Sequence, residues 1–165
     1  MKKTAIFYGS TSGNCEGIAN KIAEALGVSD VFSASQLDAA KLAEYDNLLL
    51  GSSTWGCGDL QDDWYDGVDV IKSSDLSGKT VAVFGCGDSS GFSSTYCDAI
   101  GTLYEAAKGA GANMIGAVST DGYTFDESTS VVDGKFVGLA LDEDNESDKT
   151  DERITAWVEE IKPML

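Results

Sequence analysis

Residues 7–20 read FYGSTSGNCEGIAN. A short apolar run breaks into a loop of small hydroxyl residues and glycine, and a helical pattern then begins near Asn14 or Cys15. Strand, small-residue loop and helix in this order are typical of the first unit of a parallel α/β sheet. The loop, residues 10–15, contains no Lys, Arg or His. Its hydroxyls and backbone N–H groups at a helix start suit a phosphate bound by dipoles alone, or an ordinary helix cap.

Further apolar runs continue the pattern along the chain. The five predicted strands are residues 4–8, 30–33, 47–50, 80–84 and 113–118. Runs without polar alternation indicate strands that are covered on both faces. Helical stripes lie between them: Ile18, Ile22 and Leu26; Leu60, Trp64, Val68 and Ile71; Ile100, Leu103, Tyr104 and Ala107; and Ile154, Trp157, Val158 and Ile161, with Thr150 as the expected N-cap. The alternation predicts a three-layer, doubly wound α/β fold with a five-stranded parallel sheet.

One segment interrupts the alternation. Residues 120–138 are polar, Gly-rich and weakly strand-like, and they predict an insertion near the last strand. The chain of 165 residues is 42% apolar and shows no repeat or linker. We therefore expect a single domain over residues 1–165.

The net charge of the protein limits the classes of partner that it can bind. Eleven Lys and Arg stand against 28 Asp and Glu, for a net charge of −17 without His. Nucleic acid is nearly excluded, because binding it needs cationic side chains. The charge serves either solubility or steering toward basic partners. No apolar window approaches a signal-peptide core or a membrane span, so we expect a cytoplasmic protein without membrane insertion.

Two more loops follow predicted strands on the same edge of the sheet. Residues 52–60 place Trp55 among hydroxyl residues and glycines, and residues 85–98 place Phe92 in a similar setting. Each aromatic either stacks on a flat ligand ring or packs within its loop. In an open parallel sheet ligands bind beyond the carboxyl ends of the strands. A phosphate loop and two aromatics therefore predict a mononucleotide with a large ring, and flavin mononucleotide (FMN) fits best.

Over essentially its whole length the sequence resembles the long-chain flavodoxins. The resemblance lies in GSTSGN (9–14), STWGCGDLQDDW (53–64), GCGDSSGF (85–92), DAIGTLYE (98–105), STDGYTF (119–125), VVDGKFVGLALDEDN (131–145) and TDERITAWV (150–158). It implies strand order 2-1-3-4-5 and a low-potential one-electron carrier with non-covalent FMN. Such a carrier shuttles between semiquinone and hydroquinone and serves redox enzymes in place of ferredoxin.

The resemblance also implies the cofactor-binding residues. They are Ser10, Thr11, Ser12, Gly13, Asn14 and Cys15 in the phosphate loop, with Ser53 or Thr54 adding a hydroxyl; Trp55 and Phe92 on the inner and outer ring faces; Gly56, Cys57, Gly58, Cys86, Gly87 and Asp88 at the ring edges; Cys97 nearby; and Asp144 near the ribityl chain. Gly56 is expected to favour the semiquinone through a backbone change.

Four residues depart from the family pattern. Cys15 stands where the family usually has Thr, and Phe92 where it usually has Tyr. Cys86 and Cys97 replace a common Thr and Gln. The four cysteines, which include Cys57, match no C-x-x-C spacing, so they predict reduced thiols that serve as packing residues rather than in a redox or metal role.

The implied partners are basic redox proteins, such as a flavodoxin/ferredoxin reductase and an electron-accepting enzyme. Five acids follow Trp55 and form either a solvated helix face or a docking surface for transient complexes: Asp59, Asp62, Asp63, Asp66 and Asp69. We expect a monomer. An FMN-dependent NAD(P)H or quinone reductase on the same fold is the alternative function, and a receiver-type signalling domain is a third.

Overall fold

The computed structural model describes residues 1–11, 13–55 and 58–165. Its helices are α1 (Asn14–Leu26), α2 (Ala39–Glu44), α3 (Trp64–Ser73), α4 (Asp98–Gly109) and α5 (Thr150–Ile161). Its strands are β1 (Thr4–Gly9), β2 (Val31–Ser33), β3 (Asn47–Trp55), β4 (Asp59–Leu60), β5 (Thr80–Cys86), β6 (Asn113–Ile115), β7 (Val118–Ser119), β8 (Val131–Val132), β9 (Lys135–Phe136) and β10 (Leu139–Leu141). None of the helices in these ranges is both long and apolar enough to cross a membrane.

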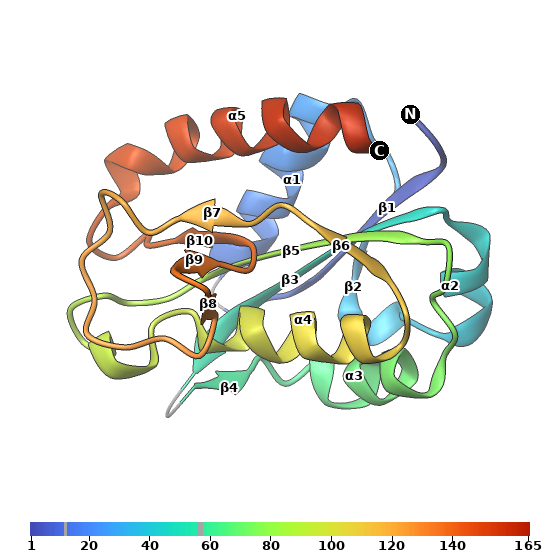
Figure 1. Cartoon of the computed structure of the whole chain (residues 1–165), viewed down its shortest axis with the longest axis horizontal. Helices are drawn as coiled ribbons and strands as arrows, with labels where there is room; N and C mark the ends of the chain where they lie inside the picture. The colour runs from blue at the N-terminus through green and yellow to red at the C-terminus, as the bar shows by residue number, and fades with distance from the viewer. Residues whose placement is uncertain (12, 56–57) are drawn as a thin grey trace.

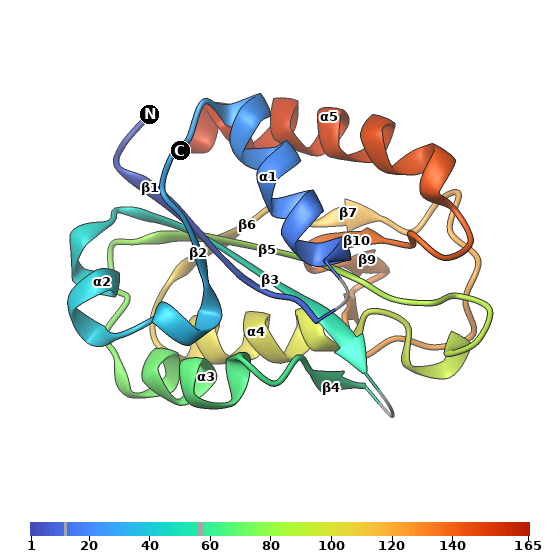
Figure 2. The ribbon, with the colours of Figure 1, turned by 180° about the vertical axis from the view of Figure 1, so that it is seen from behind.

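The central sheet is parallel and has the order β2-β1-β3-β5, with a fifth position beyond β5. Helices α1 and α5 cover one face, and α3 and α4 cover the other (Figure 1; Figure 2). This is the predicted doubly wound α/β fold.

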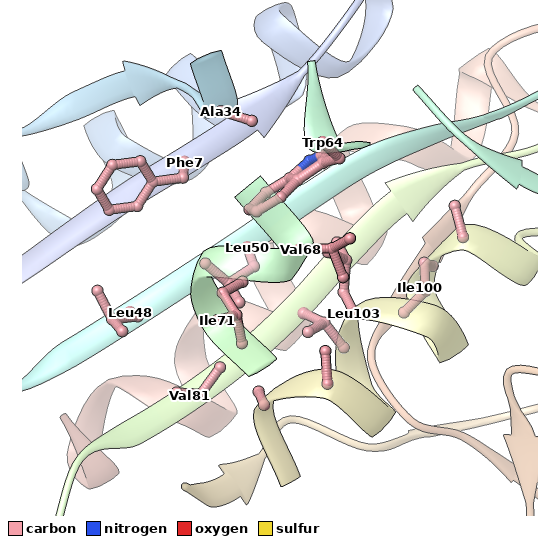
Figure 3. Close-up of a cluster of buried hydrophobic side chains, with 14 of the residues drawn as sticks. Phe7, Ala34, Leu48, Leu50, Trp64, Val68, Ile71, Val81, Ile100 and Leu103 are labelled. Carbon is pink, nitrogen blue, oxygen red and sulfur yellow. The ribbon is translucent and has the colours of Figure 1, made fainter. Parts of the chain in front are cut away.

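Successive residues of the buried strands face opposite sides of the sheet and enter two different cores. In β3, Leu48 and Leu50 belong to the core under α3 and α4, whereas Leu49 belongs to the core under α1 and α5. Figure 3 shows Trp64 of α3 and Leu103 of α4 in the first of these cores. Because successive strand side chains point to opposite faces, an uninterrupted apolar run fills both cores.

The fifth position of the sheet is shared by two short strands. β6 pairs with the first half of β5, from Thr80 to Ala82, and β10 pairs with its second half, from Phe84 to Cys86. The segment between them carries a small antiparallel sheet, β7-β9-β8. The predicted insertion is therefore present, but it begins at Gly116 rather than at residue 120, and the last predicted strand ends at Ile115.

Two local predictions need correction. Leu60 lies in β4, which pairs with the end of β3, and the helix of that stripe begins at Trp64. Thr150 is the first residue of α5 rather than its N-cap, because a 3₁₀ turn over Ser147–Lys149 leads directly into the helix. Thr150 is nevertheless buried, and its hydroxyl has no hydrogen-bond partner among the described residues.

Candidate functional site

The carboxyl ends of β1, β3 and β5 lie at one edge of the sheet, because these strands are parallel neighbours (Figure 2). At this edge lies a cavity of about 110 Å³. It is lined by Asn14, Ser53, Thr54, Trp55, Cys86, Gly87, Asp88, Phe92 and Asp144. All nine are among the residues that the sequence predicts for the cofactor site, and the structure brings them together at the carboxyl edge where ligands of such sheets bind.

Two aromatic side chains line this cavity from different segments: Trp55 is the last residue of β3, and Phe92 lies in the loop after β5. The side chains of Trp55 and Phe92 are 43% and 51% exposed, although both are large and apolar. Packing within the loops would have buried them, so this alternative does not describe their position. Two exposed aromatic side chains that line one cavity are suited to a flat ring.

The phosphate loop offers neutral donors. Gly13 has φ of 92°, a conformation that favours glycine, and precedes the first turn of α1. Its N–H donates to Ser10 Oγ at 3.1 Å. The first N–H groups of a helix have no intrahelical partner, and they attract negative charge. Ser12 lies outside the described residues.

Ser53 presents a hydroxyl that lacks a partner. Its side chain is buried, lines the cavity, and has no hydrogen-bond partner for Oγ in the described part of the chain. A buried polar atom without a partner is costly, so a polar ligand in the cavity would relieve this cost. Thr54 Oγ1 also lines the cavity and accepts from Ala99 N, at the start of α4, at 3.2 Å.

The cysteines divide into two groups. Cys86 lines the cavity, whereas Cys15 and Cys97 are completely buried. The Cys15 side chain packs in the core under α1 and α5, and neither Cys15 nor Cys97 is among the described residues that line the cavity. Their contact with the cofactor stays a prediction. Hydrogen bonding with the Cys15 thiol and burial raise the pKa of Cys86, and burial raises the pKa of Cys97. Protonated thiols are poor nucleophiles, which agrees with a packing role.

Glycine is required where the loops approach one another. A Cβ on Gly58, whose φ is 98°, would lie 2.7 Å from Asp98 Oδ2. A Cβ on Gly87 would lie 2.7 Å from Cys97 N. Gly56 and Cys57, which the sequence also assigns to the ring edge, lie outside the described residues.

A network of polar groups that the sequence did not reveal holds the loop after β5. Asp142 is completely buried and accepts hydrogen bonds from Ser89 N at 3.1 Å and from Ser89 Oγ. Asn145 Nδ2 donates both to Asp142 Oδ1 and to Asp88 Oδ1, at 3.1 and 2.8 Å. In the sequence, the acidic residues that follow β10 are the only sign of this network, and the family resemblance implied a role for Asp144 alone.

Three carboxylates gather beside the cavity. Oxygens of Asp88, Asp142 and Asp144 lie within 4.8 Å of one another. Desolvation, together with the neighbouring acids, raises the pKa of Asp144. In contrast, hydrogen bonds from Gly91 N and Asn145 lower the pKa of Asp88. Negative charge is therefore already concentrated where the predicted ligand would bind.

The predicted acidic surface extends away from the same cavity. Asp59 pairs with Trp55 across β3 and β4. Asp62, Asp66 and Asp69 are exposed before and along α3, and Asp63 is partly exposed. The acids thus run from the rim of the cavity along one helix. Together, fold and site define a doubly wound α/β protein with a ligand cleft at the switch point of its sheet.

Comparisons with known proteins agree with this description. The flavodoxin family model matches residues 6–157. A flavodoxin from Synechocystis sp. is 45% identical and aligns over 100% of this chain and 99% of its own length. Flavodoxin 1 from Azotobacter vinelandii is 44% identical, with 96% and 94% of the two chains covered. A crystal structure of Fusobacterium nucleatum flavodoxin bound to flavin mononucleotide is 32% identical, with a TM-score of 0.93 over 100% of this chain and 99% of the other. The chain belongs to the flavodoxin family.

Proposed function

We propose that this chain is a low-potential one-electron carrier that holds FMN non-covalently in the cavity between the three loops. The observation that carries the proposal is the pair of exposed aromatic side chains, Trp55 at the end of β3 and Phe92 in the loop after β5, which line one cavity. The unpartnered hydroxyl of Ser53 fits a polar ligand there. When bound, FMN supplies one-electron chemistry that the side chains lack.

The residues that would hold the cofactor divide by chemistry. Ser10, Thr11 and the N–H groups at the start of α1 would bind the phosphate through neutral dipoles. Trp55 and Phe92 would cover the ring and exclude water from it. None of the described residues that line the cavity is positively charged. The cofactor site thus contains no cation to offset negative charge.

The carboxylates beside the cavity should lower the reduction potential of the bound cofactor. Asp88, Asp142 and Asp144 lie within 4.8 Å of one another, and no described Lys or Arg forms an ion pair with any of them. Charges of like sign repel more strongly where protein replaces water. Further negative charge in the cavity is therefore disfavoured, and the carrier should be a strong reductant that serves in place of ferredoxin.

As a flavodoxin, the protein works with redox partners. We infer that these are basic proteins, such as a flavodoxin/ferredoxin reductase and an electron-accepting enzyme, which dock transiently on the acids from Asp59 to Asp69. The exposed acids of α3 that continue from the cavity rim support docking of basic partners, because complementary charge accelerates association. We also propose that the carrier is monomeric and cytoplasmic.

Docking is tested by electron exchange with a basic reductase at low and high salt. We expect Asp62→Asn with Asp66→Asn to slow exchange at low salt. The matched pair Glu159→Gln with Glu160→Gln, on α5 at the opposite face of the sheet, should not. Exchange that is independent of salt, or equally slowed by both pairs, would contradict the docking surface.

The cofactor is tested by the visible spectrum of the purified protein. A yellow protein that takes up one electron at a time and does not turn over NAD(P)H or a quinone supports the carrier. Turnover of either substrate would favour the reductase, which neither the fold nor the family favours. A colourless protein that does not take up added FMN would refute the proposal.

A further inference from the structure

Gln61, which directly follows β4, joins the phosphate loop to β3. Its side chain is only 4% exposed. Oε1 accepts from Asp63 N at 2.8 Å, and Nε2 donates to Thr11 Oγ1 at 2.9 Å. A backbone N–H can only donate, so the atom facing Asp63 must be the amide oxygen. The NH₂ group of Gln61 therefore faces Thr11.

This orientation decides what Thr11 can do. A hydroxyl has one proton to donate and two lone pairs that accept. Because Gln61 can only donate from Nε2, Thr11 Oγ1 must accept, and the hydroxyl proton has no acceptor among the described residues. Thr11 is exposed at the surface of the loop. In a loop without Lys, Arg or His, each free donor matters for an anion.

The rest of Gln61 is held as firmly as its amide. Its backbone N–H donates to Ser52 Oγ at 3.1 Å, and its carbonyl accepts from Trp64 N at 2.9 Å. Gly9 makes room for the side chain, since a Cβ there would lie 2.7 Å from Gln61 Oε1. The amide is thus fixed before any ligand binds, which lowers the cost of ordering it.

We propose that Gln61 is a positioning residue, which keeps Thr11 Oγ1 as an acceptor and thereby presents the Thr11 O–H as a donor to the phosphate of the ligand. The inference rests on the proposed function, because it assumes an FMN phosphate at this loop. Gln61 itself touches no ligand. It acts through Thr11.

The decisive variant is Gln61→Glu. The carboxylate keeps the size of the side chain and the oxygen that accepts from Asp63 N, but it takes the Thr11 proton as its own hydrogen bond. We expect the dissociation constant of FMN to rise about tenfold or more, because a hydrogen bond to a charged group is lost. Riboflavin has the same ring and side chain without the phosphate, so its dissociation constant should not change. Both are measured by titrating the full-length apoprotein and following flavin fluorescence.

Three controls isolate the proton of Thr11. Gln36→Glu adds the same charge at another glutamine, whose Oε1 accepts from Ser33 N at 3.2 Å, and should leave FMN binding unchanged. Lowering the pH protonates the carboxylate that Gln61→Glu introduces, and this carboxyl group can then donate to Thr11, so the affinity relative to the native chain should recover. In a Thr11→Val background, Gln61→Glu should cost much less than in the native chain.

The outcomes separate the two proposals. If the native chain does not bind FMN, the proposed function fails. If the native chain binds FMN but Gln61→Glu binds it equally well, the positioning role is wrong. Equal losses of FMN and riboflavin would mean that Gln61 only supports the fold of the loops. An equal cost with and without the Thr11 hydroxyl would mean repulsion through space, which also overturns the inference.

Discussion

Trp157 Nε1 donates a hydrogen bond to Gly116 O at 2.9 Å. This bond ties α5 to the point where the fifth position of the sheet divides into β6 and β10. Gly116 has φ of 90°, and a Cβ there would lie 2.9 Å from Trp157 Nε1. The close approach of the indole and the left-handed backbone both require glycine at this residue. The insertion therefore starts where α5 packs on the sheet.

Replacing Trp157 with Phe should lower the free energy of unfolding by about 2 kcal/mol, because the buried carbonyl of Gly116 loses its donor. The indole is 2% exposed and packs on Phe84, so Phe keeps one aromatic ring there but loses the N–H and the five-membered part of the indole, and the space that this leaves adds to the cost. Urea denaturation of the apoprotein measures the change. Trp55→Phe, at a side chain that is 43% exposed, is the control and should change stability by less than about 0.5 kcal/mol. Equal effects would show that the bond is unimportant.

Ser130 of the insertion caps α4. Its Oγ accepts from Gly101 N at 2.8 Å and donates to Cys97 O at 2.6 Å, and the residue is completely buried. We expect Ser130→Ala to destabilise the protein by about 2 kcal/mol, since the buried N–H of Gly101 loses its acceptor and Cys97 O keeps only the bond from Ile100 N. Ser73→Ala removes an exposed hydroxyl that bonds a helix carbonyl and should have little effect. Thermal unfolding of both variants decides whether the insertion stabilises α4.

Removing either cavity aromatic should weaken FMN binding. Trp55→Ala and Phe92→Ala should each raise the dissociation constant about tenfold or more, because stacking area is lost. Tyr65→Ala is a matched control, since Tyr65 is 55% exposed but lies on α3 and does not line the cavity. Fluorescence titration gives the three constants. If all three variants bind alike, the cavity is not the ring site.

Acid stability should depend on Asp88. Hydrogen bonds from Gly91 N and Asn145 hold the pKa of Asp88 below its ordinary value of 3.8. A carboxyl whose pKa is lower in the folded state contributes stability above its unfolded pKa, and this stability is lost as the pH falls through the folded pKa. Glu146, whose pKa is lowered by Lys149 and Arg153, acts in the same direction.

Asp88→Asn should therefore reduce the loss of unfolding free energy as the pH falls from about 5 to below 3.8, measured by urea denaturation. Asp66→Asn, at an exposed acid of α3, serves as the control for the removed charge. A pH profile that is as steep in Asp88→Asn as in the native chain would contradict the assignment.

Asp144 should act with the opposite sign. Desolvation and neighbouring acids raise its pKa, so its charge is unfavourable once the pH exceeds the folded pKa. Asp144→Asn should raise the stability of the folded protein at neutral pH. The FMN-loaded protein has two one-electron reduction potentials. Asp144→Asn should also raise the more negative of them by on the order of tens of millivolts, because one negative charge leaves the cavity. Potentiometry and thermal unfolding measure the two effects, and an unchanged potential would contradict the proposed role of the acids.

Much of the fold was readable from the sequence because each buried strand fills two cores. The run around Leu48, Leu49 and Leu50 has no polar alternation, and only a strand covered on both faces tolerates this. The predicted fold and the family are confirmed. The division of the fifth strand was not predicted, because it depends on Trp157, which lies far away in sequence.

The sequence predicted those parts of the candidate site whose chemistry is visible in neighbouring residues. Small hydroxyl residues before α1 and aromatics among glycines identify their own segments. Nine of the predicted site residues line one cavity, and Asn14 is the one that comes from the phosphate loop. Their role in holding FMN stays a prediction. Gln61 and Asn145 were missed because their importance lies in partners 50 and 57 residues away. The burial of Cys15 was not predicted, because loop position does not reveal which side chain of a first helical turn faces the core.

The sequence by itself determined the alternation of elements, the negative charge, and a phosphate loop without cations, because each of these is a property of neighbouring residues. Only the tertiary structure decided which donors of that loop are free. The amide of Gln61 is oriented by Asp63 and in turn orients Thr11. Hydrogen bonds between distant loops have directions that follow from three-dimensional packing, and no local pattern in the chain records them.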